Sequence, residues 1–209
     1  MKQMSLICLR KIDSAHLKSI AAAFAESFLA QSGSLSSCMN QKEAEIYFEL
    51  TLYEYQRIGA LYTLSDKEEG YIVYYKKDKG IRWYRDLYLT YRYFRDIPLE
   101  TMQKMMLIRR GWNDYTLAHA YTKDYVDVSL VAVRKEYQHQ GYLRKLMAEP
   151  FAIADRENIP AILDTDAEHK AVRYEHIGMQ IEHDEILRSG LHFYRMIYMP
   201  KKGGNHNET

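Results

Sequence analysis

The amino-acid sequence predicts one α/β (α+β) domain. Its 209 residues suffice for one well-buried core and are few for two. Hydrophobic residues make up 47% and charged residues 27% of the chain, which is the balance of a folded globular protein. After residue 111, segments of strand periodicity alternate with segments of helical periodicity. We therefore expect a single domain over residues 1–200 and a polar tail over 201–209.

Charge and cysteine content exclude several classes of partner and indicate the cellular compartment. The 29 basic and 28 acidic side chains leave a formal net charge of +1, too small to steer the chain to nucleic acid or an anionic membrane. Cys8 and Cys38 do not have the spacing of metal ligands, and two cysteines are too few to stabilise a chain of this length by disulfide bonds. No stretch has the pattern of a signal peptide or a membrane span. These observations predict a cytoplasmic protein that binds no nucleic acid, membrane or metal.

Tyrosine is unusually frequent, at 19 residues. Its ring and hydroxyl suit half-buried packing, and they also suit the wall of a pocket for an aromatic or amphipathic ligand. We interpret most of these rings as packing residues.

Two amphipathic helices are predicted near the start of the chain. Asp13 is placed to cap the first, and Asn40 with Glu43 forms the capping-box pattern of the second, which should end near Arg57 or Gly59. The first helix carries its apolar residues at spacings of three and four, namely Leu17, Ile20, Ala21, Phe24 and Phe28.

A hairpin and two further helices follow. Two β-rich runs at 60–64 and 71–75 predict the hairpin. A third helix is predicted over 83–94, and Pro98 suits the first turn of a fourth, ending before Gly111. We expect the apolar face of the third helix to pack in the core rather than to stack on bases. That face comprises Trp83, Leu87, Tyr91 and Phe94.

The second half of the chain has a regular order of elements. A strongly apolar strand at 126–133 precedes a helix at 143–154, a strand that begins at 161–163, a short helix at 168–176 and a closing hairpin. The hairpin strands cover 180–186 and 191–199, joined through Arg188, Ser189 and Gly190.

The segment 130–146 carries the chemistry, because it runs from a strand through a turn into a helix. A helix N-terminus presents unpaired backbone N–H groups and a positive dipole end, so it can hold a pyrophosphate. Gly141, near the start of the helix, has no Cβ and lets the backbone approach a ligand closely.

With this segment the sequence resembles the Gcn5-related N-acetyltransferase (GNAT) superfamily. The signature of that superfamily after its fourth strand is Gln or Arg, two residues, Gly, one residue, then Gly or Ala. Gln138, Gly141 and Leu143 occupy these positions, with leucine in place of the small residue.

A second landmark lies further along the chain in the order that the resemblance requires. Residues 162–165 correspond to the fifth strand. Tyr174 stands four residues before Gly178, where the superfamily has a tyrosine near the cofactor sulfur, and Met179 replaces the usual phenylalanine. The resemblance covers about residues 125–199.

The resemblance implies a fold, a cosubstrate and a site. The fold is a mixed central sheet of about six to seven strands flanked by helices, with a helical insertion between the third and fourth strands. The cosubstrate is acetyl-CoA, Tyr174 is the catalytic residue, and no metal is implied. The residues implied in cofactor binding are Val131, Ala132, Val133, Gln138, His139, Gln140, Gly141, Tyr142, Leu143 and Arg144.

The implied reaction is direct attack of a primary amine, of a small molecule or peptide, on the thioester. A backbone N–H of the fourth strand would stabilise the oxyanion, and Tyr174 would protonate the departing thiolate. Asp127, Asp164 and Asp166 are open alternatives for deprotonating the ammonium. A small-molecule amine is the expected partner, and the chain would be a monomer or a homodimer.

The main alternative is a degenerate relative that binds CoA without catalysis, because His139 and Leu143 add bulk beside the expected pyrophosphate. The sequence favours other classes less. A nucleic-acid binder would need a basic footprint, a metalloenzyme would need ligand spacing among the histidines, and a hydrolase would need a nucleophile motif.

Overall fold

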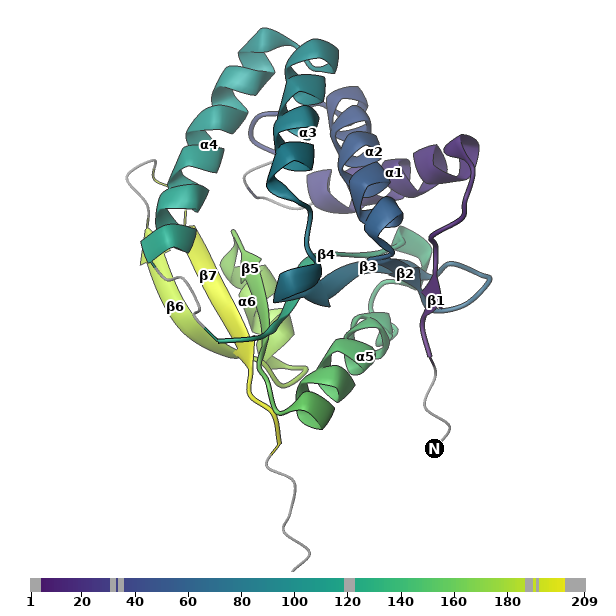
Figure 1. Ribbon diagram of the computed structural model, residues 1–209, viewed down its shortest axis with the longest axis vertical. Coiled ribbons are helices and arrows are strands. Elements are labelled where there is room, and N and C mark those ends of the chain that lie inside the picture. Colours follow the sequence, from purple (N-terminus) through teal and green to yellow (C-terminus); the bar gives the residue numbers. More distant parts are fainter. Residues whose placement is uncertain are drawn as a thin grey trace, which may run out of the picture.

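The computed structural model describes residues 5–30, 33, 36–118, 123–186, 190 and 192–201, and gives the backbone alone for 112–118. A seven-stranded sheet forms its centre, in the order β1-β2-β3-β4-β5-β7-β6 (Figure 1). The strands are β1 (Ile7–Cys8), β2 (Leu61–Thr63), β3 (Gly70–Lys76), β4 (Val126–Val133), β5 (Ala161–Thr165), β6 (Gln180–Ile186) and β7 (His192–Tyr198). The helices are α1 (Ser14–Leu29), α2 (Gln41–Ile58), α3 (Trp83–Asp96), α4 (Leu99–Ala118), α5 (Tyr142–Glu157) and α6 (Glu168–Glu175).

The sheet is mixed. β4 and β5 pair in parallel, whereas the other neighbouring strands are antiparallel. Helix α5 connects the parallel pair, and α3 and α4 lie between β3 and β4 along the chain. The structure therefore confirms the predicted mixed sheet and the helical insertion between the third and fourth strands. The two-residue strand β1 was not anticipated from the sequence.

Alternation along β3 divides the core into two layers. Tyr71 and Val73 pack with the buried faces of α1 and α2, whereas Ile72 and Tyr74 pack toward α5. Figure 1 shows α1 and α2 on one side of this part of the sheet and α5 on the other. Because both faces are covered, the middle strands are almost fully apolar.

The first two helices begin where the sequence predicts. The Asp13 carboxylate accepts from the His16 backbone N–H at 2.8 Å, which caps α1. Asn40 and Glu43 form a reciprocal capping box at the start of α2. Gly59 ends α2 in the left-handed region at φ 74°, a conformation that glycine adopts without steric cost.

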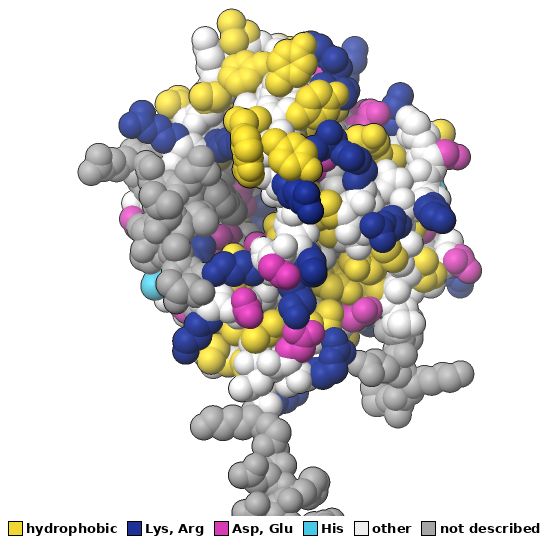
Figure 2. All heavy atoms as spheres, viewed as in Figure 1, with side chains coloured by type: hydrophobic (Ala, Val, Ile, Leu, Met, Phe, Trp, Pro, Cys, Tyr) yellow, Lys and Arg dark blue, Asp and Glu magenta, His cyan; other side chains and the backbone are white. Residues whose placement is uncertain are grey.

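The apolar stripe of α3 faces solvent, and the prediction that it packs in the core is wrong. The exposed fractions are 74% for Trp83, 61% for Leu87, 60% for Tyr91 and 44% for Phe94. Leu89 and Tyr93, on the opposite side of the helix, are buried in a small cluster with Leu50 of α2 and Met102 of α4. Figure 2 shows hydrophobic side chains gathered among basic ones over the part of the molecule where Figure 1 has α3 and α4.

Helix α4 also departs from the prediction, because it runs through Gly111 to Ala118 instead of ending before the glycine. A glycine inside a helix costs only about 1 kcal/mol, so neighbouring residues can carry the helix past it. Arg188 and Ser189 of the predicted turn and residues 202–209 of the predicted tail lie outside the described residues. No helix in the described part of the chain is long and apolar enough to cross a membrane.

Candidate active site

Strands β4 and β5 separate to form a V-shaped cleft. Their ladder contains Val126 opposite Ala161 and Asp127 opposite Ile162, and no further pair. Beyond Asp127 the two strands diverge. The apex of the cleft is therefore at Asp127, and among the described residues no strand pairs with this edge of β4 beyond it.

A β-bulge in β4 orients this free edge. Val73 pairs with Leu130 and Tyr74 with Val128, which leaves Ser129 as an extra residue. At the end of the strand, the Arg134 N–H donates to the Glu69 carbonyl beside β3. Because N–H direction alternates along a strand, the backbone groups of Val131 and Val133 face the cleft. The Val133 carbonyl accepts from the Gln138 side-chain amide at 3.1 Å, which agrees with this orientation.

The N-terminus of α5 lies at the open end of the cleft and suits an anion. Gly141 precedes the helix at φ 78°, no side chain caps the first turn, and this turn contains no acidic residue. A Cβ built on Gly141 would meet no atom within 4 Å. The first turn of α5 thus offers unpaired N–H groups beside open space, and these features fit a pyrophosphate.

One cavity of about 880 Å³ joins the cleft to the helical insertion. At one end it is lined by Val131, Gln138 and Gly141, which belong to β4 and the turn before α5. At the other end it is lined by side chains of α2, α3 and α4, among them Tyr47, Leu89, Tyr93, Met102 and Met105. The cavity therefore extends from the turn before α5, past β4, to the helices α2, α3 and α4.

Tyr174 lies on α6 and lines the same cavity as β4. Burial raises the pKa of its hydroxyl well above the usual value, with Asp166 adding to the shift. The hydroxyl therefore remains protonated at neutral pH and can donate a proton or a hydrogen bond into the cavity.

The three carboxylates considered as bases have different surroundings. Arg195 donates to both oxygens of Asp164, at 2.8 and 2.9 Å, and Lys170 donates to Asp166 at 2.8 Å. Among the described residues, Asp127 forms no ion pair. It accepts from the Ser129 hydroxyl at 2.7 Å. Asp164 and Asp166 are held by cations, so Asp127 is the carboxylate best placed to accept a proton.

The electrostatics of Asp127 support this assignment. Its carboxyl group borders the cavity and is otherwise enclosed by protein, and this burial raises its pKa to about 6. The Ser129 hydrogen bond and Arg195 oppose the shift, and Asp164 adds to it. A carboxyl group with this pKa is ionised at neutral pH and remains a far better base than an ordinary aspartate.

Tyrosine side chains continue the polar contacts away from Asp127. The Ser129 hydroxyl lies 3.0 Å from the Tyr75 hydroxyl. The Tyr75 ring stacks on Tyr55 with 5.8 Å between centroids, and burial raises the pKa of Tyr55 to about 12. The chain of contacts runs from the apex of the cleft to α2. It anchors one wall of the cavity.

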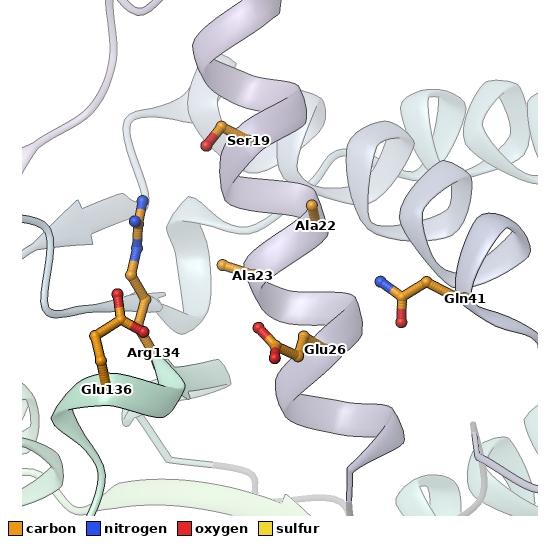
Figure 3. A pocket seen from close by; sticks show the side chains of 7 residues that line it. All are labelled: Ser19, Ala22, Ala23, Glu26, Gln41, Arg134 and Glu136. Carbon is orange, nitrogen blue, oxygen red and sulfur yellow. The ribbon is translucent and has the colours of Figure 1, made fainter.

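A second, smaller cavity of about 450 Å³ lies between α1 and the short helical turn at 135–137 (Figure 3). Arg134 and Glu136 face Ser19, Ala23 and Glu26 of α1 across it. The Arg134 guanidinium already contacts Glu68 and the Tyr71 hydroxyl. Among the described residues, the second cavity is bordered near the cleft only by Arg134 and Glu136, which follow β4, and by no residue of β4 or β5 itself. The larger cavity, which includes the β4–β5 cleft, is therefore the candidate active site.

The structure brings most of the predicted site residues together. Those that line the large cavity are Val131, Val133, Gln138, His139, Gly141, Tyr142, Leu143 and Tyr174. Ala132 points the other way and is buried against α1 and α2. The side chains of Gln140 and Arg144 bond to the carbonyls of Glu136 and His176, and neither residue lines the cavity.

Four tyrosines of the cavity wall were not among the predicted site residues. Tyr47, Tyr55, Tyr75 and Tyr93 line the cavity and also pack on one another. They come from three separate elements and form no motif. The high tyrosine content was the one signal that pointed to them, and it was interpreted as packing.

Solved structures of similar fold include several acetyltransferases. Arylalkylamine N-acetyltransferase 2 from Aedes aegypti has a TM-score of 0.61 at 10% identity, over 94% of this chain and 99% of that one. A polyamine N-acetyltransferase from Drosophila melanogaster has a TM-score of 0.59 at 10% identity, and the match covers 93% of this chain and 100% of that one. An N-acetyltransferase from Staphylococcus aureus Mu50 has a TM-score of 0.56 at 14% identity, and the match covers 88% of this chain and 96% of that one. No protein-family model matches the chain, and no curated protein matches its sequence.

Proposed function

From the GNAT acetyltransferase fold, which this chain has, we propose that the protein is an acetyl-CoA-dependent N-acetyltransferase acting on a primary amine. One observation carries the proposal. At one end of a single cavity lie the diverging strands β4 and β5, the N-terminus of α5 and Tyr174. At the other end the cavity forms a chamber lined by side chains of α2, α3 and α4. Such a cavity holds a long cosubstrate at one end and an acceptor at the other.

The residues present fit CoA. The N–H groups at the start of α5 and the open space beside Gly141 would hold the diphosphate. The free edge of β4 at Val131 and Val133 would pair with the amides of the pantetheine arm. When bound, acetyl-CoA supplies an activated acetyl group as a thioester.

The side chains then account for the movement of protons. Asp127 takes a proton from the ammonium, directly or through water, and leaves a neutral amine. The amine nitrogen bonds to the acetyl carbon and the carbon–sulfur bond breaks. A backbone N–H of β4 stabilises the negative charge on the oxygen, and Tyr174 donates a proton to the sulfur. As the carbon–sulfur bond breaks, the nitrogen loses its second proton, which restores the Tyr174 hydroxyl through water, and Asp127 releases its own proton to solvent. The products are an acetamide, free CoA and one proton.

Binding of CoA is the first test. At a CoA concentration about one hundred times its Kd, the free energy of unfolding should rise by about 2.7 kcal/mol, which shifts the Tm by several degrees. Gly141→Ala should reduce this shift, because its Cβ occupies the space beside the diphosphate. Gly190→Ala is the matched control, since Gly190 also has φ 78° and open space around it but lies beside β7.

The outcomes separate the alternatives. The phosphate-loop assignment is wrong if both glycine variants keep the full Tm shift with CoA. Release of CoA thiol from acetyl-CoA in the presence of amines distinguishes an enzyme from a relative that binds CoA without catalysis. A Tm shift with no thiol release for any amine would favour the binding protein.

A further inference from the structure

We propose that the acceptor is a primary amine with a single positive charge and an aromatic or similarly apolar body, and that the chamber beneath α2, α3 and α4 binds this body. The inference rests on the proposed acetyl transfer, because that reaction places the acceptor at the end of the cavity opposite the α5 N-terminus. It goes further by naming the substrate class.

The walls of the chamber are aromatic and apolar. Tyr47 and Tyr93 stack with 5.1 Å between ring centroids, and Leu89, Met102 and Met105 line the cavity with them. Flat rings and flexible methionine side chains together adapt to a planar apolar ligand. The chamber is therefore suited to bury a ring or an alkyl chain.

The hydroxyl groups of the wall are already engaged by the protein. The Tyr93 hydroxyl lies 2.6 Å from the Thr51 hydroxyl, which in turn donates to the Tyr47 carbonyl. The Tyr75 hydroxyl is bonded to Ser129. Because these groups have partners, a polar acceptor would have to compete for them, and the ring faces are what the wall offers.

The charges that border the cavity allow one ammonium group. Asp86 is paired with Arg109 at 2.9 Å, and Asp164 and Asp166 are paired as described above. Asp127, at the apex of the cleft, has no cation partner among the described residues and attracts an ammonium. At the far end the carboxylate of Asp86 is already neutralised by Arg109, so a second ammonium there would lose its water without gaining an unpaired carboxylate. A polyamine therefore has one favourable position for an ammonium and one that is not favourable.

Three amines test this prediction. The probes are 2-phenylethylamine, the diamine 1,5-diaminopentane and ethanolamine, each assayed by release of CoA thiol from acetyl-CoA. Burial of the phenyl ring should raise kcat/KM for 2-phenylethylamine at least about tenfold over both other amines. Equal or higher kcat/KM for the diamine overturns the inference and leaves the proposed acetyl transfer intact.

A charge introduced into the wall provides the matched variant. Met105→Glu adds a carboxylate to the chamber, so the preference for 2-phenylethylamine over the diamine should fall at least about tenfold. Leu107→Glu adds the same charge to α4 at a residue that is 67% exposed and does not line the cavity, and it should leave the preference unchanged. The same change of preference in both variants would contradict the chamber assignment.

Binding of the amines to the protein saturated with CoA, measured by calorimetry, tests the chamber without turnover. Tighter binding of 2-phenylethylamine than of the diamine supports the assignment even where no thiol is released, and in that case the proposed reaction fails on its own. Equal affinity for the two amines, or tighter binding of the diamine, overturns the assignment. This measurement also keeps the test valid if Met105→Glu does not fold.

Discussion

Asp127 combines a functional position with a cost in stability. Its folded-state pKa of about 6 lies above the usual value of 3.8, because the ionised carboxylate is poorly solvated at the apex of the cleft. Between these two values the folded protein retains a proton that the unfolded chain has lost. Stability therefore falls as the pH rises from about 4 to about 6, and the deficit persists at higher pH.

Asp127→Asn should thus stabilise the protein above pH 6 while it lowers activity. The expected gain at pH 7 is up to about 3 kcal/mol, and it should vanish below about pH 3, where both states of the parent are protonated. In the parent, kcat/KM should rise with pH through about 6, and this rise should be absent from the variant. Chemical denaturation at several pH values and steady-state kinetics measure the two effects.

Asp66→Asn serves as the control, because this substitution removes the same formal charge from a residue that is exposed in the loop before β3. It should leave the pH profiles of both stability and kcat/KM unchanged. An Asp127→Asn variant with the parental pH profile of kcat/KM would assign the base to another group.

Removal of the Tyr174 hydroxyl should lower the turnover number more than it weakens the binding of CoA. Tyr174→Phe retains the ring and removes the proton donor, so kcat should fall about 100-fold while the Kd of CoA stays near the parental value. Because the pKa of Tyr174 is raised, the parental hydroxyl should not lose its proton over the neutral range. Rapid-quench kinetics with an accepted amine would isolate the chemical step.

Tyr198→Phe is the matched control for that change. The Tyr198 hydroxyl contacts both carboxylate oxygens of Asp155 at 3.1 Å, away from the cavity lining. Its removal should affect stability by about 1 kcal/mol and leave kcat unchanged. Equal kcat values for Tyr174→Phe and the parent, with chemistry rate-limiting, would make Tyr174 a packing residue.

At the scale of the element, α3 offers two leucines with opposite surroundings. Leu89 is 6% exposed in the cluster with α2 and α4, whereas Leu87 is 61% exposed. Leu89→Ala should lower the free energy of unfolding by about 2–4 kcal/mol, and Leu87→Ala should change it by no more than about 0.5 kcal/mol. Urea denaturation of both variants measures the difference. Similar losses at the two positions would contradict the orientation of the helix.

The same helix shows what periodicity can and cannot predict. α3 has apolar residues on two sides, so the 3.6-residue repeat predicts a helix without choosing its buried side. The choice comes from tertiary contacts: Arg85 forms a bidentate pair with Glu54 of α2, and Tyr93 bonds to Thr51. By contrast, Asn40 and Glu43 cap α2 through local contacts, and these were predictable from four adjacent residues.

The site divides in the same way. The half of the site proposed to bind the cosubstrate is one continuous segment from β4 to α5, and Gln138 and Gly141 were predicted there from their match to the superfamily signature. Its acceptor half is assembled from side chains far apart in sequence, such as Tyr47, Tyr75 and Met105. Long-range packing brings these together, and no local pattern encodes it.

Across the whole molecule, the sheet consists of two parts joined at Asp127 and its neighbour. β1–β4 form one part and β5–β7 the other. The core beneath α5 spans the join, since Ile72 and Val128 of the first part share a buried cluster with Leu163 and Met196 of the second. Shared side-chain packing therefore adds to the short β4–β5 ladder in holding the two parts together.

The free edge of β4 has a consequence for amide hydrogen exchange. The N–H groups of Val131 and Val133 face the cleft, whereas that of Ala132 faces β3, so protection should alternate along one strand. In the free protein Val131 and Val133 should exchange rapidly and Ala132 slowly. Saturation with CoA should slow Val131 most, and residue-resolved exchange would measure this. Uniform protection of the three amides without CoA would mean that the cleft is closed in solution, with β5 or another segment already paired to β4.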